Sequence, residues 1–155
     1  MPIIERLDGA RRVRQGFACG ESSLDEYLRQ RASRHQRDGI STTHVLVEKV
    51  GESYMLGYYS LAAAQTELAE PEEADRPRLP RYPVPAIRMA RRAVATGAQG
   101  KGHGDFLLAH AVARCVDLRE QLGVWVILVD ALLAKAARFY RVYGFRDVSA
   151  EGGTL

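Results

Sequence analysis

The sequence has few of the features that mark a secreted, membrane-bound or metal-binding protein. Its two cysteines, Cys19 and Cys115, lie far apart and outside any paired-ligand spacing, so we expect two reduced thiols, no disulfide and no metal site. No apolar run reaches the roughly 18 residues of a membrane span, and residues 1–5 lack a signal-peptide pattern. We therefore expect a cytoplasmic protein that does not contact a membrane.

Lysine is also scarce, since only three of the 22 basic residues are lysines and the rest are arginines. Arginine suits bidentate contacts with phosphate. Residues 76–92 contain six arginines and no acidic residue, and a second arginine cluster runs through 11–14 and 29–37. These clusters are compatible with binding an RNA-sized polyanion. Solvated faces that keep the protein soluble, or a genome with biased codon usage, explain them as well.

Length and hydrophobic patterning predict a single α/β domain over residues 1–155. The expected order is β-α-β-β-β-α-β-α-β, which implies a mixed sheet with at least one parallel crossover. We expect strands at 3–6, 42–50, 54–64, 87–96, 124–129 and from Gly144, with a hairpin turn at 51–53. We expect one helix that is capped by Ser22 or Ser23 and ends before Gly39, another from near Asp105 to Gly123, and a third capped by Asp130. The proline-rich segment 67–85 should contain no strand.

The expected helices have apolar faces that should pack on the sheet. In the first helix this face consists of Leu24, Tyr27, Leu28 and Ala32. In the second it consists of Phe106, Leu107, Ala109, His110, Ala113 and Val116. We interpret His110 as a residue at the core edge or on the surface.

A glycine-rich turn, residues 99–104, separates the strand at 87–96 from the second helix. Glycine lets a backbone approach a ligand closely, and a helix N-terminus favours an anion, so we expect a ligand that carries a pyrophosphate. The turn is not a Walker A loop, because no Ser or Thr follows Gly100-Lys101. It is not a Rossmann fingerprint either, because its third glycine comes one position early. An ordinary tight turn between strand and helix remains an alternative.

Two signatures in this order resemble the GCN5-related N-acetyltransferases (GNATs). The spacing of Gln99, Gly102 and Gly104 is similar to that superfamily's acyl-coenzyme A pyrophosphate loop. Asp130-Ala131, and then the run from Ala137 through Phe139-Tyr140 to Gly144-Phe145, resemble its second signature. The resemblance implies the GNAT fold, a mixed central sheet flanked by helices, with acetyl-CoA as co-substrate and no metal. It implies cofactor contacts from the backbone of Ala93, Val94 and Ala95 and from Gln99, Gly100, Lys101, Gly102, Gly104 and Asp105.

Three further segments resemble the acetyltransferase toxins of bacterial toxin–antitoxin pairs: 17–28, 57–62 and 82–86. The resemblance implies acetylation of the α-amine of aminoacyl-tRNA, arrest of translation and a cognate ribbon-helix-helix antitoxin. The basic surface of one chain is small compared with a tRNA, so we expect two copies of the chain to act together as a homodimer. We expect Arg91, Arg88 and Tyr59 to bind the acceptor. The chain departs from the toxin pattern at Arg92, where the toxins usually carry leucine, and at Leu132-Leu133, where they often carry charged residues.

The resemblance makes Tyr140 the expected catalytic residue. The amine must attack a thioester carbonyl, the developing oxyanion needs a donor, and the departing thiolate needs a proton. A phenol with a reference pKa of about 10 is protonated at neutral pH and can donate to sulfur. Alternatively, Tyr140 is a packed aromatic beside Phe139. Residues 87–96 contain no Glu or Asp to act as a base, which suits an α-amine of pKa about 8 better than a lysine of about 10.4.

Two other functions stay open. The chain could acetylate a small-molecule or protein amine, in which case the arginine clusters would be incidental. It could also be a non-catalytic acyl-CoA- or RNA-binding module that kept the fold. The presence of Tyr140 argues against the second of these.

Overall fold

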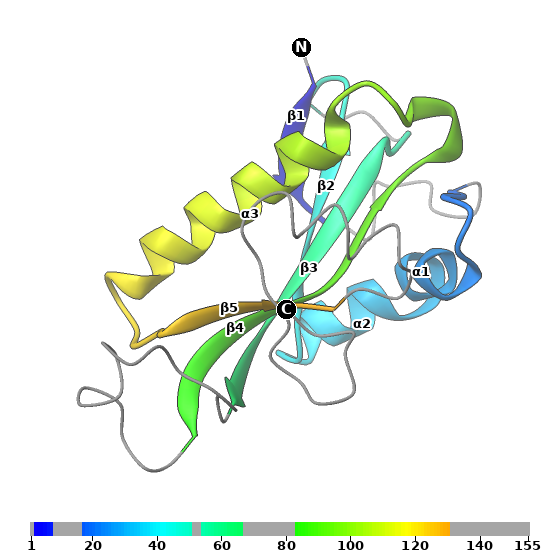
Figure 1. The fold of residues 1–155 in the computed structure, drawn as a ribbon. Helices are drawn as coiled ribbons and strands as arrows, with labels where there is room; N and C mark the ends of the chain where they lie inside the picture. The colour runs from blue at the N-terminus through cyan, green and yellow to red at the C-terminus, as the bar shows by residue number, and fades with distance from the viewer. Residues whose placement is uncertain (1, 8–16, 51–53, 67–82, 131–155) are drawn as a thin grey trace.

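A computed structural model describes residues 2–7, 17–50, 54–66 and 83–130. They form one five-stranded sheet with the order β1-β2-β3-β4-β5 (Figure 1). The strands are β1 (Ile3–Arg6), β2 (Thr42–Val47), β3 (Gly57–Thr66), β4 (Val84–Val94) and β5 (Val126–Val129). Successive strands from β1 to β4 are antiparallel to one another, and β5 is parallel to β4. The mixed sheet with a parallel crossover is thus confirmed.

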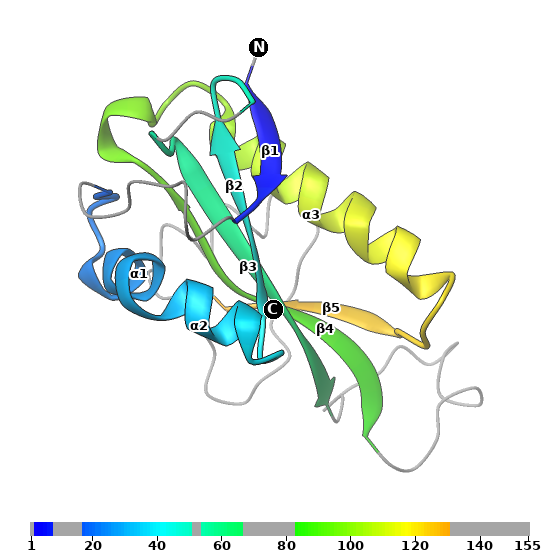
Figure 2. The ribbon, with the colours of Figure 1, turned by 180° about the vertical axis from the view of Figure 1, so that it is seen from behind.

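Helices cover both faces of this sheet (Figures 1 and 2). One face carries a continuous helical segment made of α1 (Ser22–Glu26), a π-helical turn η1 (Tyr27–Arg31) and α2 (Ala32–Arg37). The other face carries α3 (His103–Arg119), which follows a short 3₁₀ turn η3 (Thr96–Ala98). The α3 helix is the crossover that joins the parallel strands β4 and β5, as expected for a β-α-β unit.

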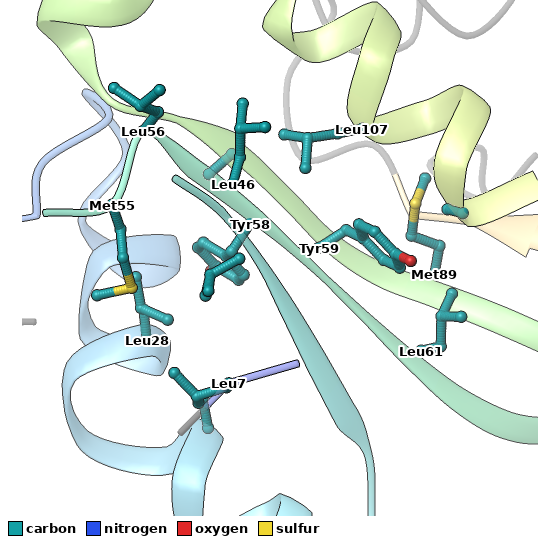
Figure 3. Close-up of a cluster of buried hydrophobic side chains, with 14 of the residues drawn as sticks. Leu7, Leu28, Leu46, Met55, Leu56, Tyr58, Tyr59, Leu61, Met89 and Leu107 are labelled. Carbon is teal, nitrogen blue, oxygen red and sulfur yellow. The ribbon is translucent and has the colours of Figure 1, made fainter. Parts of the chain in front are cut away.

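Two neighbouring tyrosines show how β3 fills both halves of the core. Successive strand residues point to opposite faces of a sheet. The Tyr58 hydroxyl donates to the Leu24 carbonyl oxygen at the start of the first helix, at 2.7 Å, whereas the Tyr59 hydroxyl lies 2.7 Å from Nδ1 of His110 on α3. Figure 3 shows Tyr58 among Leu28 and neighbouring apolar side chains, and Tyr59 on the opposite side. Both rings are fully buried, so the sheet has a hydrophobic core on each face.

The first helix contains the predicted apolar face but not the predicted cap. Tyr27, Leu28 and Ala32 are fully buried and Leu24 is partly buried, which confirms the face. The N-cap residue is Glu21, with no side-chain capping hydrogen bond. In η1 the Ala32 N–H donates to the Tyr27 carbonyl five residues earlier, and this extra residue in the turn places Ala32 on the sheet. The helix ends at Arg37, before Gly39 as expected.

The predicted apolar face of α3 is right in part. Leu107 is buried and His110 lies at the core edge against Tyr59, as expected, whereas Phe106, Ala109, Ala113 and Val116 are exposed. The other buried residues of the helix are Leu108, Ala111 and Cys115. The helix packs through Leu107, whose Cδ1 would lie 3.0 Å from a Cβ added at Gly57. The close approach of α3 to β3 at this glycine turns the face with Leu107, Leu108, Ala111 and Cys115 towards the sheet.

Strand boundaries differ from the expected ones where strands meet the proline-rich segment and the hairpin. The β2 strand stops at Val47, and β3 starts at Gly57 and extends to Thr66. The β4 strand begins at Val84, so Pro85 lies inside a strand that we did not expect there. Pro85 is tolerated because it is only the second residue of the strand and its carbonyl accepts from the Trp125 N–H at 2.9 Å. The predicted turn at 51–53, third helix and last strand lie outside the described residues.

Candidate active site

A cavity of about 420 Å³ lies between the N-terminus of α1 and the N-terminus of α3, at the end of β4. Its lining residues come from the segment leading into α1, from β4 and from the glycine-rich turn: Cys19, Gly20, Glu21, Leu24, Arg92, Ala93, Val94, Ala98, Gln99, Gly100, Gly102, His103, Gly104 and Asp105. The structure therefore brings together most of the residues expected to bind a cofactor. Ala95 and Lys101 are the two that do not line the cavity.

The glycine-rich turn gives the cavity its anion-binding end. Gly100 and Gly102 both have φ of +81°, a left-handed conformation that glycine adopts without strain. Gly102 is the N-cap of α3, and no side chain caps this helix. The N–H groups of the first turn have no acceptor within the helix, and the helix dipole adds partial positive charge. Because His103, Gly104 and Asp105 of that turn line the cavity, the site suits a phosphate group.

At the other end of the cavity, no strand of the described residues pairs with the outer edge of β4. Within the described residues, β4 pairs with β5 from Ala86 to Met89. Met89 lies opposite Leu61 and Arg91 lies opposite Ser60, so Ala90 is an extra residue in β4. Such a bulge bends a strand away from its neighbour. Beyond the bulge, β4 offers backbone groups with which an extended ligand can pair.

The ladder between β3 and β4 shows which backbone groups face that edge. The Ala95 N–H donates to the Leu56 carbonyl at 2.8 Å. In an antiparallel ladder, pairs that exchange hydrogen bonds alternate with pairs that do not, so Ala93 also directs its backbone groups to β3, and Arg92 and Val94 direct theirs to the open edge. The backbone groups of Ala93 and Ala95 therefore point to β3 and not to the open edge, and of the three expected backbone contacts only that of Val94 faces this edge. Arg92, which we had not assigned to the cofactor, takes a place beside Val94.

Gln99 clamps the segment before α1 onto the end of β4. Its Nε2 group donates to the Cys19 carbonyl at 2.9 Å and to the Val94 carbonyl at 3.0 Å. The Thr96 N–H and hydroxyl both donate to the Ala18 carbonyl, at 2.8 and 3.0 Å. Since both amide hydrogens of Gln99 are used, only its side-chain oxygen can meet a ligand.

Asp25 completes the same wall and was missed by the sequence reasoning. Its carboxylate is buried and accepts the Cys19 N–H at 2.9 Å. Burial, followed by the contact with Asp25, raises the pKa of Cys19 to about 11. The thiol is therefore protonated at neutral pH and is not a nucleophile.

Of the three residues expected to bind the acceptor, Tyr59 is corrected by the structure. Its ring is fully buried and stacked on His44, with centroids 5.1 Å apart. Helices cover both faces of β3, which leaves no side of Tyr59 for a substrate. Arg88 forms an ion pair with Asp130, which follows β5. The guanidinium carbon of Arg91 lies 3.8 Å from the centroid of the Tyr27 ring.

The remaining predicted site residues differ in their exposure and in whether the structure describes them. Arg92 is half-buried and lines the cavity, so the strand face is not simply solvated there. Lys101 is exposed on the glycine-rich turn. Tyr140 and Leu132-Leu133 lie outside the described residues. Within the described ranges, no group of three or more His, Cys, Asp or Glu residues could hold a metal ion, and no helix is long and apolar enough to cross a membrane.

Comparisons with known proteins give close relatives. No family model matches the chain. A tRNA-acetylating toxin from Mycobacterium tuberculosis is 37% identical over 129 residues, which cover 83% of this chain and 75% of the relative. A structure of AtaT in complex with acetyl-methionyl-tRNAfMet matches with a TM-score of 0.92 and 30% identity, covering 100% of this chain and 93% of AtaT. A Tyr-to-Phe mutant of AtaT, bound to acetyl-CoA and to the C-terminus of the antitoxin AtaR, matches with a TM-score of 0.84 and 29% identity over 98% and 89% of the two chains.

Proposed function

The chain belongs to the family of tRNA-acetylating toxins, and from this membership we propose that it acetylates the α-amine of aminoacyl-tRNA and so arrests translation. It is an N-acetyltransferase with the GNAT fold, and acetyl-CoA is its co-substrate. The observation that best supports the proposal is a cavity between the N-terminus of α3 and the edge of β4 that no described strand covers, in a chain that matches AtaT over 100% of its own length.

The two ends of the cavity suit the two parts of coenzyme A. The uncapped first turn of α3, with Gly100 and Gly102 before it, holds the pyrophosphate. The outer edge of β4 pairs with the extended pantetheine arm through the backbone of Arg92 and the N–H of Val94, whose carbonyl accepts from Gln99. Lys101 supplies a flexible cation next to the phosphates, and Gln99 shapes the rim of the cavity.

The chemistry requires little acid–base help from the described residues. The α-amine nitrogen forms a bond to the thioester carbonyl carbon, the carbon–sulfur bond breaks, and the amine loses a proton to solvent. Part of an α-amine with a pKa of about 8 is already neutral at physiological pH. No carboxylate lies on the described part of β4, and nearby Asp130 is paired with Arg88. We assign to Tyr140 the role of general acid: its neutral phenol donates a proton to the departing thiolate.

The partners follow from the same family membership. We propose that the chain is silenced by a cognate antitoxin of the ribbon-helix-helix class, works as a homodimer and acts in the cytoplasm. AtaT with the C-terminus of AtaR supports an antitoxin partner for this chain. The net charge of +3 and the scarcity of lysine among the basic residues support a phosphate-rich acceptor.

The proposed function predicts selective transfer of label from radioactive acetyl-CoA. The purified protein should label charged tRNA and leave deacylated tRNA, polyamines and lysine peptides unlabelled. Replacing Tyr140 by Phe should lower kcat by roughly 10² to 10⁴-fold, since the leaving thiolate loses its acid, without changing the affinity for acetyl-CoA. Tyr143→Phe in the same segment is the matched control and should retain wild-type kcat.

Two results would contradict these assignments separately. Labelling of peptides or polyamines with charged tRNA left untouched would overturn the acceptor. An unchanged kcat in the Tyr140→Phe variant would remove Tyr140 from the mechanism and leave the acceptor standing.

A further inference from the structure

Beside the cavity, on the α1 side of the sheet, Tyr27 and Arg91 form a cation–π pair. Tyr27 is the first residue of the π-helical turn η1, and Arg91 lies on β4 opposite Ser60. The guanidinium carbon of Arg91 is 3.8 Å from the centroid of the Tyr27 ring. This distance is well inside the approximately 6 Å within which a cation is attracted to a ring face.

The Tyr27 ring is fixed from several sides. It is fully buried, and its hydroxyl lies 2.6 Å from Oγ of Ser41. The centroids of the Tyr27 and His35 rings lie 5.4 Å apart, and the two rings pack edge to face. The Ala32 N–H donates to the Tyr27 carbonyl across the π-helical turn, and such turns occur frequently at functional sites. Tyr27 is therefore a rigid platform for the cation above it.

A ring holds a guanidinium in a different way from a carboxylate. The face of a ring attracts the charge but accepts no N–H···O hydrogen bonds, so the donors at the edge of the guanidinium stay available. Arg88, by contrast, uses NH1 for its ion pair with Asp130. Within the described part of the chain no carboxylate pairs with Arg91. Arg91 is thus held in place without an ion pair from the described residues, which suits recognition of a phosphate.

The pair borders the cavity through its immediate neighbours. Ala93, two residues after Arg91 on the same strand face, lines the cavity, and so does Leu24, one helical turn before Tyr27. The coenzyme end of the cavity is at α3, on the opposite face of the sheet. A phosphate at Arg91 therefore belongs to an acceptor that approaches from the α1 side.

We propose that Tyr27 is a positioning residue that holds Arg91 to bind a phosphate near the 3′ end of the acceptor tRNA. The inference rests on the proposed function, because it assumes an RNA acceptor. It deepens that function by adding a residue that touches neither substrate and acts through the cation above its ring.

Fluorination of the ring tests this without changing its shape. Tyr27→Phe retains the ring face and should keep the wild-type KM for aminoacyl-tRNA, with Ser41→Ala as the control for the lost hydrogen bond. Pentafluorophenylalanine at position 27 reverses the ring quadrupole and should raise that KM about 3- to 10-fold. The KM for acetyl-CoA and kcat should stay at the values of Tyr27→Phe, which lacks the same hydroxyl. In an Arg91→Ala background the fluorinated ring should have no further effect.

The outcomes separate the inference from the function on which it rests. An unchanged KM for aminoacyl-tRNA with the fluorinated ring, in a protein that acetylates charged tRNA, would overturn the inference alone. Equal effects of fluorination with and without Arg91, or an equal rise in the KM for acetyl-CoA, would also overturn it and leave Tyr27 a purely structural residue. A wild-type protein that acetylates no charged tRNA would overturn the proposed function and the inference together.

Discussion

His44 is buried on the α3 side of the sheet with its ring stacked on Tyr59. Its Nδ1 atom is buried and has no hydrogen-bond partner within the described residues. Burial lowers the pKa of His44 to about 4, and the charges of Arg114, His110 and Arg6 act in the same direction. The folded protein therefore holds this imidazole in its neutral form.

This predicts a loss of stability in mild acid. Because the folded pKa is below the unfolded value of about 6.5, the unfolded state binds more protons, and stability falls as pH drops from about 6.5 towards 4. His110, whose pKa burial also lowers, adds to the loss. His44→Phe keeps the stacked ring and removes one titration, so its free energy of unfolding in urea should fall less than that of the wild type between about pH 7 and pH 5. Equal losses in both proteins would contradict the assignment.

The roles of single residues were predicted well where backbone conformation decides them. They were predicted poorly where contacts with residues distant in the sequence decide them. The glycines at 100 and 102 were expected in a tight turn, and their positive φ angles agree. Tyr59 was expected to bind the acceptor because strand alternation alone does not show that both faces of β3 are covered. Asp25 was missed because its partner, the Cys19 N–H, is a backbone group with no sequence signal.

At the scale of elements, the clamp made by Gln99 joins three parts of the chain. Its amide ties the segment before α1 to the end of β4, and Gln99 itself is the first residue of the glycine-rich turn that leads into α3. The shape of the cavity therefore depends on two hydrogen bonds from one side chain. Sequence spacing alone indicated a contact with the ligand, because it cannot show which partners an amide will find.

Replacing Gln99 by Glu tests the clamp with almost no change in shape. A carboxylate cannot donate to the Cys19 and Val94 carbonyls and is repelled by them. Each lost hydrogen bond contributes about 1 kcal/mol, so the Kd for acetyl-CoA, measured by calorimetry, should rise roughly tenfold or more. Gln99→Ala, which leaves no repulsive charge, should show a smaller rise. Wild-type affinity in Gln99→Glu would show that the clamp does not shape the cavity.

The order and type of the described elements were predicted correctly, whereas their faces and ends were not. Hydrophobic periodicity shows that a helix follows the glycine-rich turn, but it does not show that Leu108, Ala111 and Cys115 join Leu107 on the buried face, because contact with β3 at Gly57 sets how α3 is turned. The π-helical turn at 27–31 has no local sequence signal. Pro85 lies inside β4 because strand pairing accepts a proline at the start of a strand.

For the molecule as a whole, the proposed function places the two substrates on opposite faces of one sheet. The coenzyme end lies at the N-terminus of α3, and Arg91 lies on the opposite face under the first helix. The bulge in β4 opens the sheet between them. The proposed reaction takes place at this opening, where an amine from one face meets the thioester from the other.

Part of this whole-molecule account could be predicted from the sequence and part could not. The mixed sheet and the acyl-CoA loop follow from patterning and from a resemblance carried by motifs. The acceptor was predicted from family resemblance, arginine content and the absence of a base, none of which is a geometric feature. A single domain over residues 1–155 and the role of Tyr140 stay predictions, because neither follows from the described residues.

The central claim is that the acetyl group goes to the α-amine of an amino acid esterified to tRNA. Mass spectrometry of nuclease digests tests it most directly, after incubation of the purified protein with acetyl-CoA and a mixture of charged tRNAs. We predict N-acetylaminoacyl-adenosine among the products, formed only with acetyl-CoA and only from charged tRNA. Unmodified aminoacyl-adenosine throughout, with acetyl groups recovered on lysine side chains or polyamines added to the same reaction, would contradict the claim.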